Sequence, residues 1–207
     1  MTKSIRELEQ LQQKLEYQNS ELRVFIADVI PGESSKQEMQ DIMLETQNLV
    51  NTYGWVVILS HIQKKANPDY KTYIWSGKLD EIILEMQEKN ANLLIIWNEL
   101  KPLQIYNINQ KLKTIWAKAW DRIDLILKIF EKNAKTTETK LQIELASIKH
   151  MWPRIFGMWM ELGSQWSWWN KWSRWKWETN TEIMKRHLFE RERHIRKDLD
   201  KFIKGRA

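Results

Sequence analysis

Apolar residues in the first part of the chain follow two alternating patterns. Continuous runs rich in Val, Ile, Leu and aromatic residues predict strands at 23–30, 55–62, 92–97 and 114–119. Apolar residues spaced three or four apart predict helices at 34–53, 78–89 and 102–113. Strands that alternate with amphipathic helices favour an α/β fold, with a small, mainly parallel sheet flanked by helices.

Local signals mark where these elements begin and end. Pro31-Gly32 closes the first strand, and Ser34 or Ser35 is a candidate cap for the helix that follows. Residues 64–77 predict a loop. A further helix is predicted at 2–20, where apolar residues recur at Ile5, Leu8, Leu11, Leu15 and Leu22. We therefore assign 1–21 to an N-terminal helical extension and 22–121 to an α/β subdomain.

After Asp121 the pattern becomes helical throughout. A helix is predicted at 122–133, and a longer one follows from about 136. The longer helix carries apolar residues at alternating spacings of four and three, namely Leu141, Leu145, Ile148, Trp152 and Ile155. A second seam lies in 179–204 at Met184, Leu188, Ile195, Leu199 and Phe202. Two such seams are typical of a coiled-coil-like pair.

The region 122–207 therefore predicts a long antiparallel two-helix arm with a loop, 163–178, at its tip. Pro153 would kink or shorten the first of the two helices, because proline removes a backbone donor and clashes with the preceding turn.

The predicted loop has an unusual composition. The chain contains 13 Trp and only 6 Gly, and six of the tryptophans fall within 166–177, in QWSWWNKWSRWKWE. Taken literally, the segment is an aromatic and basic ribbon. With glycine at each tryptophan, it becomes a flexible loop able to approach phosphate groups.

Charge and residue usage narrow the function classes. A net charge of +6 makes polyanions such as RNA plausible partners. The absence of cysteine excludes disulfides and thiolate sites, and the four histidines show no metal-ligand spacing. No run approaches the roughly 20 apolar residues of a membrane span. The N-terminus lacks the apolar core of a signal peptide, so we expect a cytoplasmic protein.

The last helix is basic. Residues 183–206 hold nine Lys or Arg and four acidic residues. This charge pattern fits a solvated helix face with charge pairs, and it equally fits a surface that faces phosphates.

Five segments of the chain form a recognisable series. They are YIWSGKLDEI (73–82), NELKPLQIYNI (98–108), AWDRIDLILKIF (119–130), KTTETKLQIELASIKHMWPRIFGM (135–158) and WSRWKWETNTEIMKR (172–186). In content and order they resemble the HflX family of ribosome-associated GTPases, and the resemblance covers roughly residues 22–207. The combination of KLQIELA with the later PR and GE(T)-like blocks is specific.

The family has glycine where this chain has several of its tryptophans. These positions are Trp75, Trp166, Trp168, Trp169, Trp172, Trp175 and Trp177. A single codon event explains so many identical changes, because some bacterial lineages read UGA as glycine. Our hypothesis is that the sequence was translated with the wrong genetic code, so that UGA codons for glycine appear as tryptophan. Further candidates are Trp55, Trp97, Trp116 and Trp152, whereas Trp120 fits the family as an apolar residue and Trp159 is compatible with either residue.

Physical chemistry favours the glycine interpretation. A loop between nucleic-acid backbones needs positive φ angles and close approach of N–H groups to phosphates. Six exposed indoles would instead form an aggregation-prone patch. The literal alternatives are stacking of the aromatic residues on unpaired bases, and contact with a membrane interface.

The resemblance implies a G domain after residue 207, with GTP and Mg²⁺ bound there. The chain itself contains no phosphate-loop motif of the form G-x-x-x-x-G-K-S/T. We therefore expect no cofactor, no catalytic residue and no GTP hydrolysis by this chain, although the full-length family hydrolyses GTP. Carboxylates in the α/β half, such as Asp80, Glu81 and Asp121, form no convincing catalytic pair.

The function that the resemblance implies is association with the large ribosomal subunit and its rRNA, in ribosome splitting or rescue. We expect a monomer without DNA specificity or membrane contact. The alternative is a stand-alone basic RNA-binding module without NTPase activity. Carried over residue by residue, the RNA-contact loop contains Gln165, Lys171, Arg174, Lys176 and Glu178. The pairs Asp121-Arg122 and Pro153-Arg154 are interpreted as a structural joint between sheet and arm.

Overall fold

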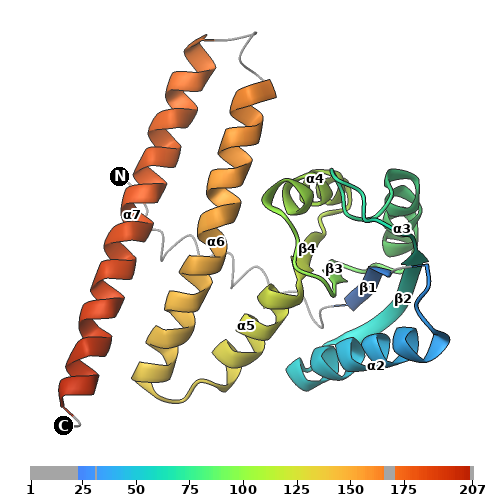
Figure 1. Ribbon diagram of the computed structural model, residues 1–207, viewed down its shortest axis with the longest axis horizontal. Helices are drawn as coiled ribbons and strands as arrows, with labels where there is room; N and C mark the ends of the chain where they lie inside the picture. Colours follow the sequence, from blue (N-terminus) through green and yellow to red (C-terminus); the bar gives the residue numbers. More distant parts are fainter. Residues whose placement is uncertain (1–22, 31, 166–170, 206–207) are drawn as a thin grey trace.

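A computed structural model describes residues 23–30, 32–165 and 171–205. Its centre is a parallel sheet of β1 (Arg23–Ile30), β2 (Val56–Lys64), β3 (Leu93–Ile96) and β4 (Lys118–Asp121). The strand order is β2-β1-β3-β4, so β2 and β4 are its edges (Figure 1). The predicted α/β class with a small parallel sheet is confirmed.

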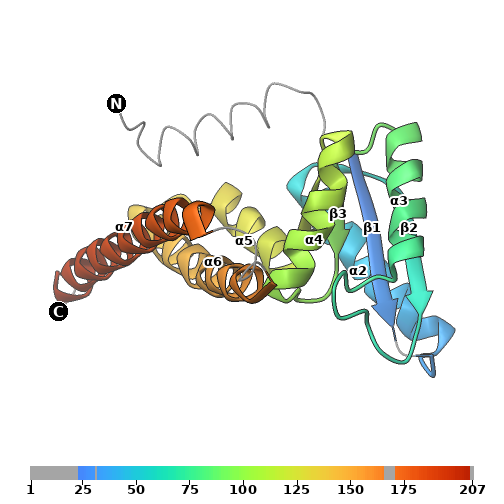
Figure 2. The same cartoon turned by 90° about the horizontal axis from the view of Figure 1, so that it is seen from above.

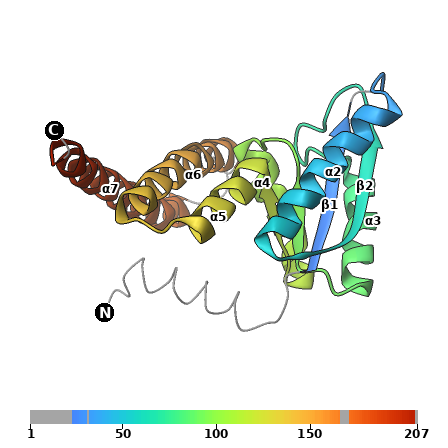
Figure 3. The same cartoon turned by 90° about the horizontal axis from the view of Figure 1, so that it is seen from below.

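Helices cover both faces of this sheet. Alternate β1 residues point to opposite faces, because side chains along a strand alternate in direction. Phe25, Ala27 and Val29 pack with residues of α3 (Ser76–Glu88) and α4 (Pro102–Leu112). Val24 and Ile26 pack with residues of α2 (Lys36–Tyr53) and α5 (Arg122–Asn133) on the other face. Figures 2 and 3 show the resulting three layers from above and below.

Helix α2 begins and ends as its sequence predicts. The Ser35 hydroxyl accepts a hydrogen bond from the Glu38 backbone N–H, and the Glu38 carboxylate accepts one from the Ser35 N–H. This reciprocal capping box satisfies two donors that the first helical turn leaves unpaired. Gly54 ends α2 in the left-handed conformation, with φ 97°, which glycine adopts without a Cβ clash.

The strand predicted at 114–119 is wrong in position. Residues Lys113–Ile115 continue α4 as a 3-10 turn, and Trp116 adopts a left-handed conformation with φ 57°. The strand begins only at Lys118 and pairs with β3, from Leu93↔Lys118 to Ile96↔Asp121. Tertiary pairing and the reversal at Trp116 fix these bounds, whereas the apolar run alone could not separate a helix end from a strand start.

Two long helices follow the α/β layers. They are α6 (Thr137–Gln165) and α7 (Lys171–Lys204), which run in opposite directions side by side (Figure 1). Ile148, Leu188 and Ile195 are buried between them, and four further seam residues pack against this cluster, namely Leu141, Leu145, Trp152 and Leu199.

Both long helices extend beyond their predicted ends. The loop was predicted at 163–178, but α6 continues to Gln165 and α7 already begins at Lys171. Tryptophan is tolerated in a helix, whereas each glycine at such a position would cost about 1 kcal/mol relative to alanine. Pro153 lies inside α6 and does not end it.

Helix α5 belongs with the sheet rather than with the long helices. Its Leu125 is fully buried beside Val24, Ile26 and Leu93, and Ile129 packs against the same cluster. This packing differs from the prediction that places 122–133 in the arm. The predicted N-terminal helical extension, 1–21, lies outside the described residues.

Candidate functional site

The most densely charged buried cluster lies where β4 meets α5. Asp121 ends the strand, is fully buried, and caps α5 by accepting a hydrogen bond from the Asp124 N–H at 3.0 Å. The Asp124 carboxylate in turn accepts a hydrogen bond from the Asp121 N–H at 3.1 Å. The Leu100 N–H also donates to Asp121, at 3.2 Å. Backbone donors therefore fix the direction of both carboxylates.

Two cationic side chains reach this cluster from α6. His150 and Arg154 lie four residues apart, so they project from the same face of the helix. The Arg154 Nη1 atom donates to both oxygens of Asp124, at 2.8 and 3.1 Å, and Nη2 donates to Asp121. The His150 Nε2 atom lies 3.4 Å from a carboxylate oxygen of each aspartate. We call these four side chains the junction network.

The junction network favours the charged forms of Asp121 and His150. Burial alone would raise the pKa of Asp121, but the interaction with His150 and the charge of Arg154 hold it well below its usual range. Burial lowers the pKa of His150, yet the two carboxylates outweigh that effect and raise it to about 9. The imidazole is therefore protonated at neutral pH, and the four charges sum to zero.

The donor atoms of Asp121, Asp124 and His150 lie within 4.8 Å of one another, a spacing that could suit a metal ion. Both carboxylates are already paired with the guanidinium of Arg154, which always carries its positive charge. A divalent cation would have to displace it. The arrangement therefore fits a self-neutralised ion network better than a metal centre.

A second polar cluster lies near the carboxyl ends of β1 and β3, the edge where parallel sheets commonly bind ligands. The Asp28 carboxylate is buried and accepts hydrogen bonds from the Tyr73 hydroxyl at 3.0 Å and the Asn98 amide at 3.0 Å. Its partners here are neutral. Burial consequently raises the pKa of Asp28, although these hydrogen bonds oppose the effect.

Tyr73 is strained and held by the same contacts. Its φ is 62°, a left-handed value that non-glycine residues rarely adopt. Burial and the neighbouring Asp28 raise the pKa of its hydroxyl, so it remains a hydrogen-bond donor. The cluster ties the 65–75 loop to β1 and β3, and each side chain in it has a partner. This is the arrangement expected of a structural anchor.

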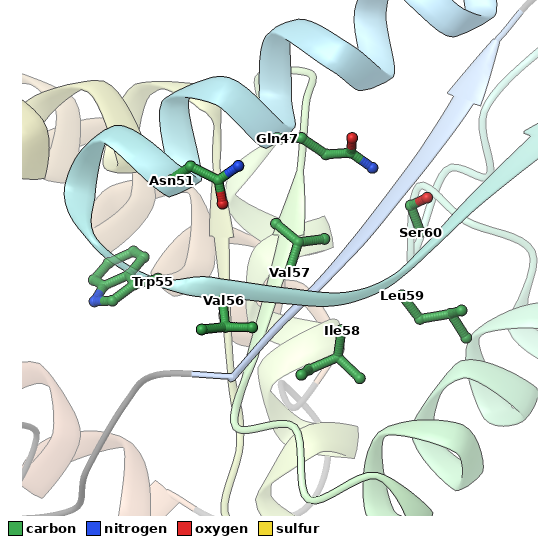
Figure 4. Close-up of a pocket in the computed structure, with 8 residues that line it drawn as sticks. All are labelled: Gln47, Asn51, Trp55, Val56, Val57, Ile58, Leu59 and Ser60. Carbon is green, nitrogen blue, oxygen red and sulfur yellow. The ribbon is translucent and has the colours of Figure 1, made fainter.

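A hollow of about 440 Å³ lies beside the edge strand β2. Gln47 and Asn51 of α2 line it together with Trp55 and the strand residues 56–60 (Figure 4). The register between β1 and β2 shifts after Val24, which leaves Ile58 as an extra residue in the strand. None of the lining residues can titrate near neutral pH, so the hollow offers no acid or base for catalysis.

The predicted joint residues separate into two groups. Asp121 and Arg154 are in direct contact. Arg122 points elsewhere, because its guanidinium lies 4.2 Å from the Trp97 ring centre and 3.7 Å from Glu45. Pro153 is exposed on α6. Asp124 and His150 are not among the predicted joint residues, because their contacts with α6 and α5 join segments distant in sequence. The D-x-x-D capping pattern at 121–124 was the available signal for Asp124.

The predicted RNA-contact residues lie at the ends of α6 and α7. Gln165 is the last residue of α6 and Lys171 the first of α7, while Arg174, Lys176 and Glu178 lie within α7. Trp172, Trp175 and Trp177 are also helical backbone positions of α7. Trp166, Trp168 and Trp169 lie outside the described residues.

The remaining tryptophans differ in their surroundings. Trp116 is 93% exposed and left-handed, and Trp75 is 54% exposed at the start of α3. Trp97 is buried, and Trp120 packs 5.2 Å from Trp55 between ring centres. Among the glycine candidates within the described part, Trp116 is the one whose backbone favours glycine.

Two family matches cover most of the chain. Residues 40–131 match the family described as GTP-binding GTPase N-terminal, and residues 133–207 match GTP-binding GTPase Middle Region. The boundary between them falls at the end of α5. The chain therefore combines the N-terminal and middle regions of a GTP-binding GTPase.

Curated relatives named GTPase HflX agree with this assignment. The chain is 33% identical to one from Flavobacterium psychrophilum over 69% of its own length and 34% of the relative. It is 34% identical to one from Caldanaerobacter subterraneus subsp. tengcongensis, over 83% of its length and 39% of the relative. The chain belongs to the HflX family of GTPases. It spans little more than a third of the length of these two relatives.

A solved structure shares the fold. It is a GTP-binding protein from the hyperthermophilic archaeon Sulfolobus solfataricus in complex with GDP. The TM-score is 0.60 at 26% sequence identity, over 87% of this chain and 45% of that protein.

No phosphate-loop motif of the form G-x-x-x-x-G-K-S/T occurs in the sequence, and the junction network offers paired carboxylates rather than backbone donors for phosphate. Within the described part, no helix is both long and apolar enough to cross a lipid bilayer.

Proposed function

We propose that this chain is the ribosome-binding N-terminal part of an HflX-type GTPase. It associates with the large ribosomal subunit through the segment that joins α6 and α7. The observation that carries this proposal is membership of the family through both its N-terminal and its middle region. Full-length members would supply GTP and Mg²⁺ chemistry from a separate G domain.

The geometry of the long helices is compatible with an arm that presents a contact segment. The end of α6 at Gln165 and the start of α7 at Lys171 lie at the same end of the pair, opposite the turn between α5 and α6 (Figure 1). Apolar packing around Ile148 and Ile195, with an ion pair between Glu144 and Arg191, stiffens the pair. A stiff arm keeps its tip at a defined distance from the sheet.

Lys171, Arg174 and Lys176 supply the positive charge of the proposed contact. Each phosphate that a cation neutralises releases counterions, so binding to rRNA weakens as salt rises. Glycine in place of the six tryptophans at 166–177, three of which lie in α7, would weaken the start of this helix and let backbone N–H groups approach the phosphates, which indoles would prevent.

The test is co-sedimentation of the chain, made with glycine at those six positions, with purified large ribosomal subunits. Reversing charge in Arg174→Glu with Lys176→Glu should lower affinity more than tenfold and reduce the salt slope by about 2. The matched control reverses the exposed Lys113 and Lys135, which lie away from the arm tip, and should leave both quantities unchanged.

Two outcomes would contradict the proposal. Equal losses in the loop variant and its control would indicate diffuse attraction by a stand-alone basic RNA-binding module. An unchanged affinity in the loop variant would place the contact elsewhere on the chain.

A further inference from the structure

The arm and the α/β layers have separate hydrophobic cores. Buried apolar residues on the two faces of the sheet form two clusters, and those between α6 and α7 form a third. Among the side chains that the structure describes, the third cluster shares no residue with the other two. Helix α6 nevertheless lies against α4 and α5. In this described part, apolar burial holds each unit together, and a charged cluster crosses between them.

The junction network spans this boundary. Asp121 and Asp124 belong to the start of α5, on the sheet side, whereas His150 and Arg154 belong to α6. Asp121 is fully buried, and the side chains of His150 and Arg154 are 11% and 17% exposed. Charges this far from water depend on one another, because removing one partner leaves the others buried and unpaired.

The carboxylates cannot follow α6 if that helix shifts. Asp121 accepts backbone hydrogen bonds from Asp124, in the first turn of α5, and from Leu100, and Asp124 accepts one from the Asp121 N–H. The Arg154 guanidinium is planar and matches this fixed pair of carboxylates in one orientation. A small rotation of α6 would therefore break several charged contacts together rather than stretch them gradually.

We propose that the junction network is a latch that sets the angle between the α6–α7 arm and the α/β subdomain. When it is closed, the arm has one orientation. When Arg154 or Asp124 loses its partner, the arm samples others while both units stay folded on their own cores. This inference is independent of ribosome binding.

Because the chain has no cysteine, spin labels can be attached only at introduced cysteines. Pulsed electron–electron double resonance then measures the distance between two labels. Spin labels at Leu84→Cys on α3 and Lys197→Cys on α7 report the angle between the units, since both positions are exposed. A second pair, Leu84→Cys with Leu44→Cys on α2, reports the α/β subdomain alone. The chain with its network intact should give a single narrow distance distribution for each pair.

Asp124→Asn and Arg154→Met should each broaden or shift the distribution between 84 and 197 and leave that between 84 and 44 unchanged. Asparagine retains an oxygen that can accept from the Asp121 N–H, so the α5 cap survives. Arg154→Lys keeps the charge without the planar fork and should give an intermediate width. The matched control is Glu144→Gln, which breaks the ion pair with Arg191 inside the arm and should not change the angle.

Two results would overturn the latch. Unchanged distributions between 84 and 197 in both Asp124→Asn and Arg154→Met would mean that other contacts set the angle. Broadening of both label pairs together would mean that the network maintains folding as a whole and has no specific role in orientation.

Discussion

The guanidinium of Arg154 donates to both carboxylate oxygens of Asp124, at 2.8 and 3.1 Å, across 30 residues of sequence. The same guanidinium contacts the fully buried Asp121. Arg154→Met should therefore lower the free energy of unfolding by about 3–5 kcal/mol, because it strands buried negative charge. Urea denaturation followed by circular dichroism measures the change.

Arg122→Met is the matched control for that substitution. Arg122 is adjacent to Asp121 in sequence, yet its ion pair with Glu45 is 3.7 Å long and lies at the surface. Exposed pairs contribute about 0–1 kcal/mol, and the contact with the Trp97 ring about 0.5–1 kcal/mol, so this variant should lose less than about 2 kcal/mol. Similar losses of unfolding free energy in the two variants would show that the buried junction network stabilises the fold no more than an exposed ion pair does.

The raised pKa of His150 predicts a specific pH dependence. Its pKa is about 9 in the folded chain, against an ordinary value of 6.5. A raised histidine pKa stabilises the folded state fully below the unfolded value. That stabilisation should fall as the pH rises from 6.5 through 9.

The measurement is the urea midpoint across this pH range, compared between the chain and His150→Gln. The variant should lose the slope between pH 6.5 and 9, while residual slopes from other groups remain in both. A His150 pKa at or below 6.5, measured by NMR, would contradict the prediction.

The strands and helices of the α/β layers were largely predictable, because their signals are local. The run RVFIADVI is β1 without adjustment, and of the two candidate caps for α2, Ser34 and Ser35, the structure uses Ser35. The strand predicted at 114–119 has the wrong bounds, because the apolar residues of TIWAKA are equally compatible with the end of a helix and with a strand. Only pairing with β3 decides where β4 begins.

The junction network was only half predictable. Asp121 and Arg154 stood out through the resemblance, but nothing near Asp124 in sequence indicates that it meets His150 and Arg154. That meeting depends on how α5 and α6 pack, which no periodicity encodes. The assignment of α5 to the arm differed from the structure for a related reason. An amphipathic helix shows which face is buried, and it does not show the surface that buries it.

The Tyr73 hydroxyl gives a test of the second polar cluster. It donates a hydrogen bond to the Asp28 carboxylate at 3.0 Å and accepts one from the Asn98 amide at 2.6 Å. Tyr73→Phe removes a donor from a buried carboxylate and should lower the free energy of unfolding by about 1–3 kcal/mol. Tyr70→Phe, at a 65% exposed position in the same loop, is the control and should be near neutral. An equally small effect in both variants would mean that Asp28 is satisfied without Tyr73.

Trp116→Gly should stabilise the chain, which is an unusual expectation for loss of a large side chain. Trp116 is 93% exposed, so the indole contributes little burial. Its left-handed backbone, with φ 57°, penalises a Cβ by roughly 1 kcal/mol, and glycine avoids that penalty. The greater freedom of glycine in the unfolded chain offsets part of the gain. The net result should be a rise in melting temperature of a few degrees or less.

Trp97→Gly is the informative contrast, because Trp97 is only 5% exposed and stacks beneath Arg122. It should lose about 3–5 kcal/mol through the cavity left behind. Reading the codons at both positions then tests the codon hypothesis against these energies. UGA at 116 together with a stabilising Trp116→Gly would mean that glycine is the residue this backbone evolved with. A UGG codon at 116 with a destabilising Trp116→Gly would show that the tryptophan is genuine and that the left-handed turn is held by contacts the indole makes.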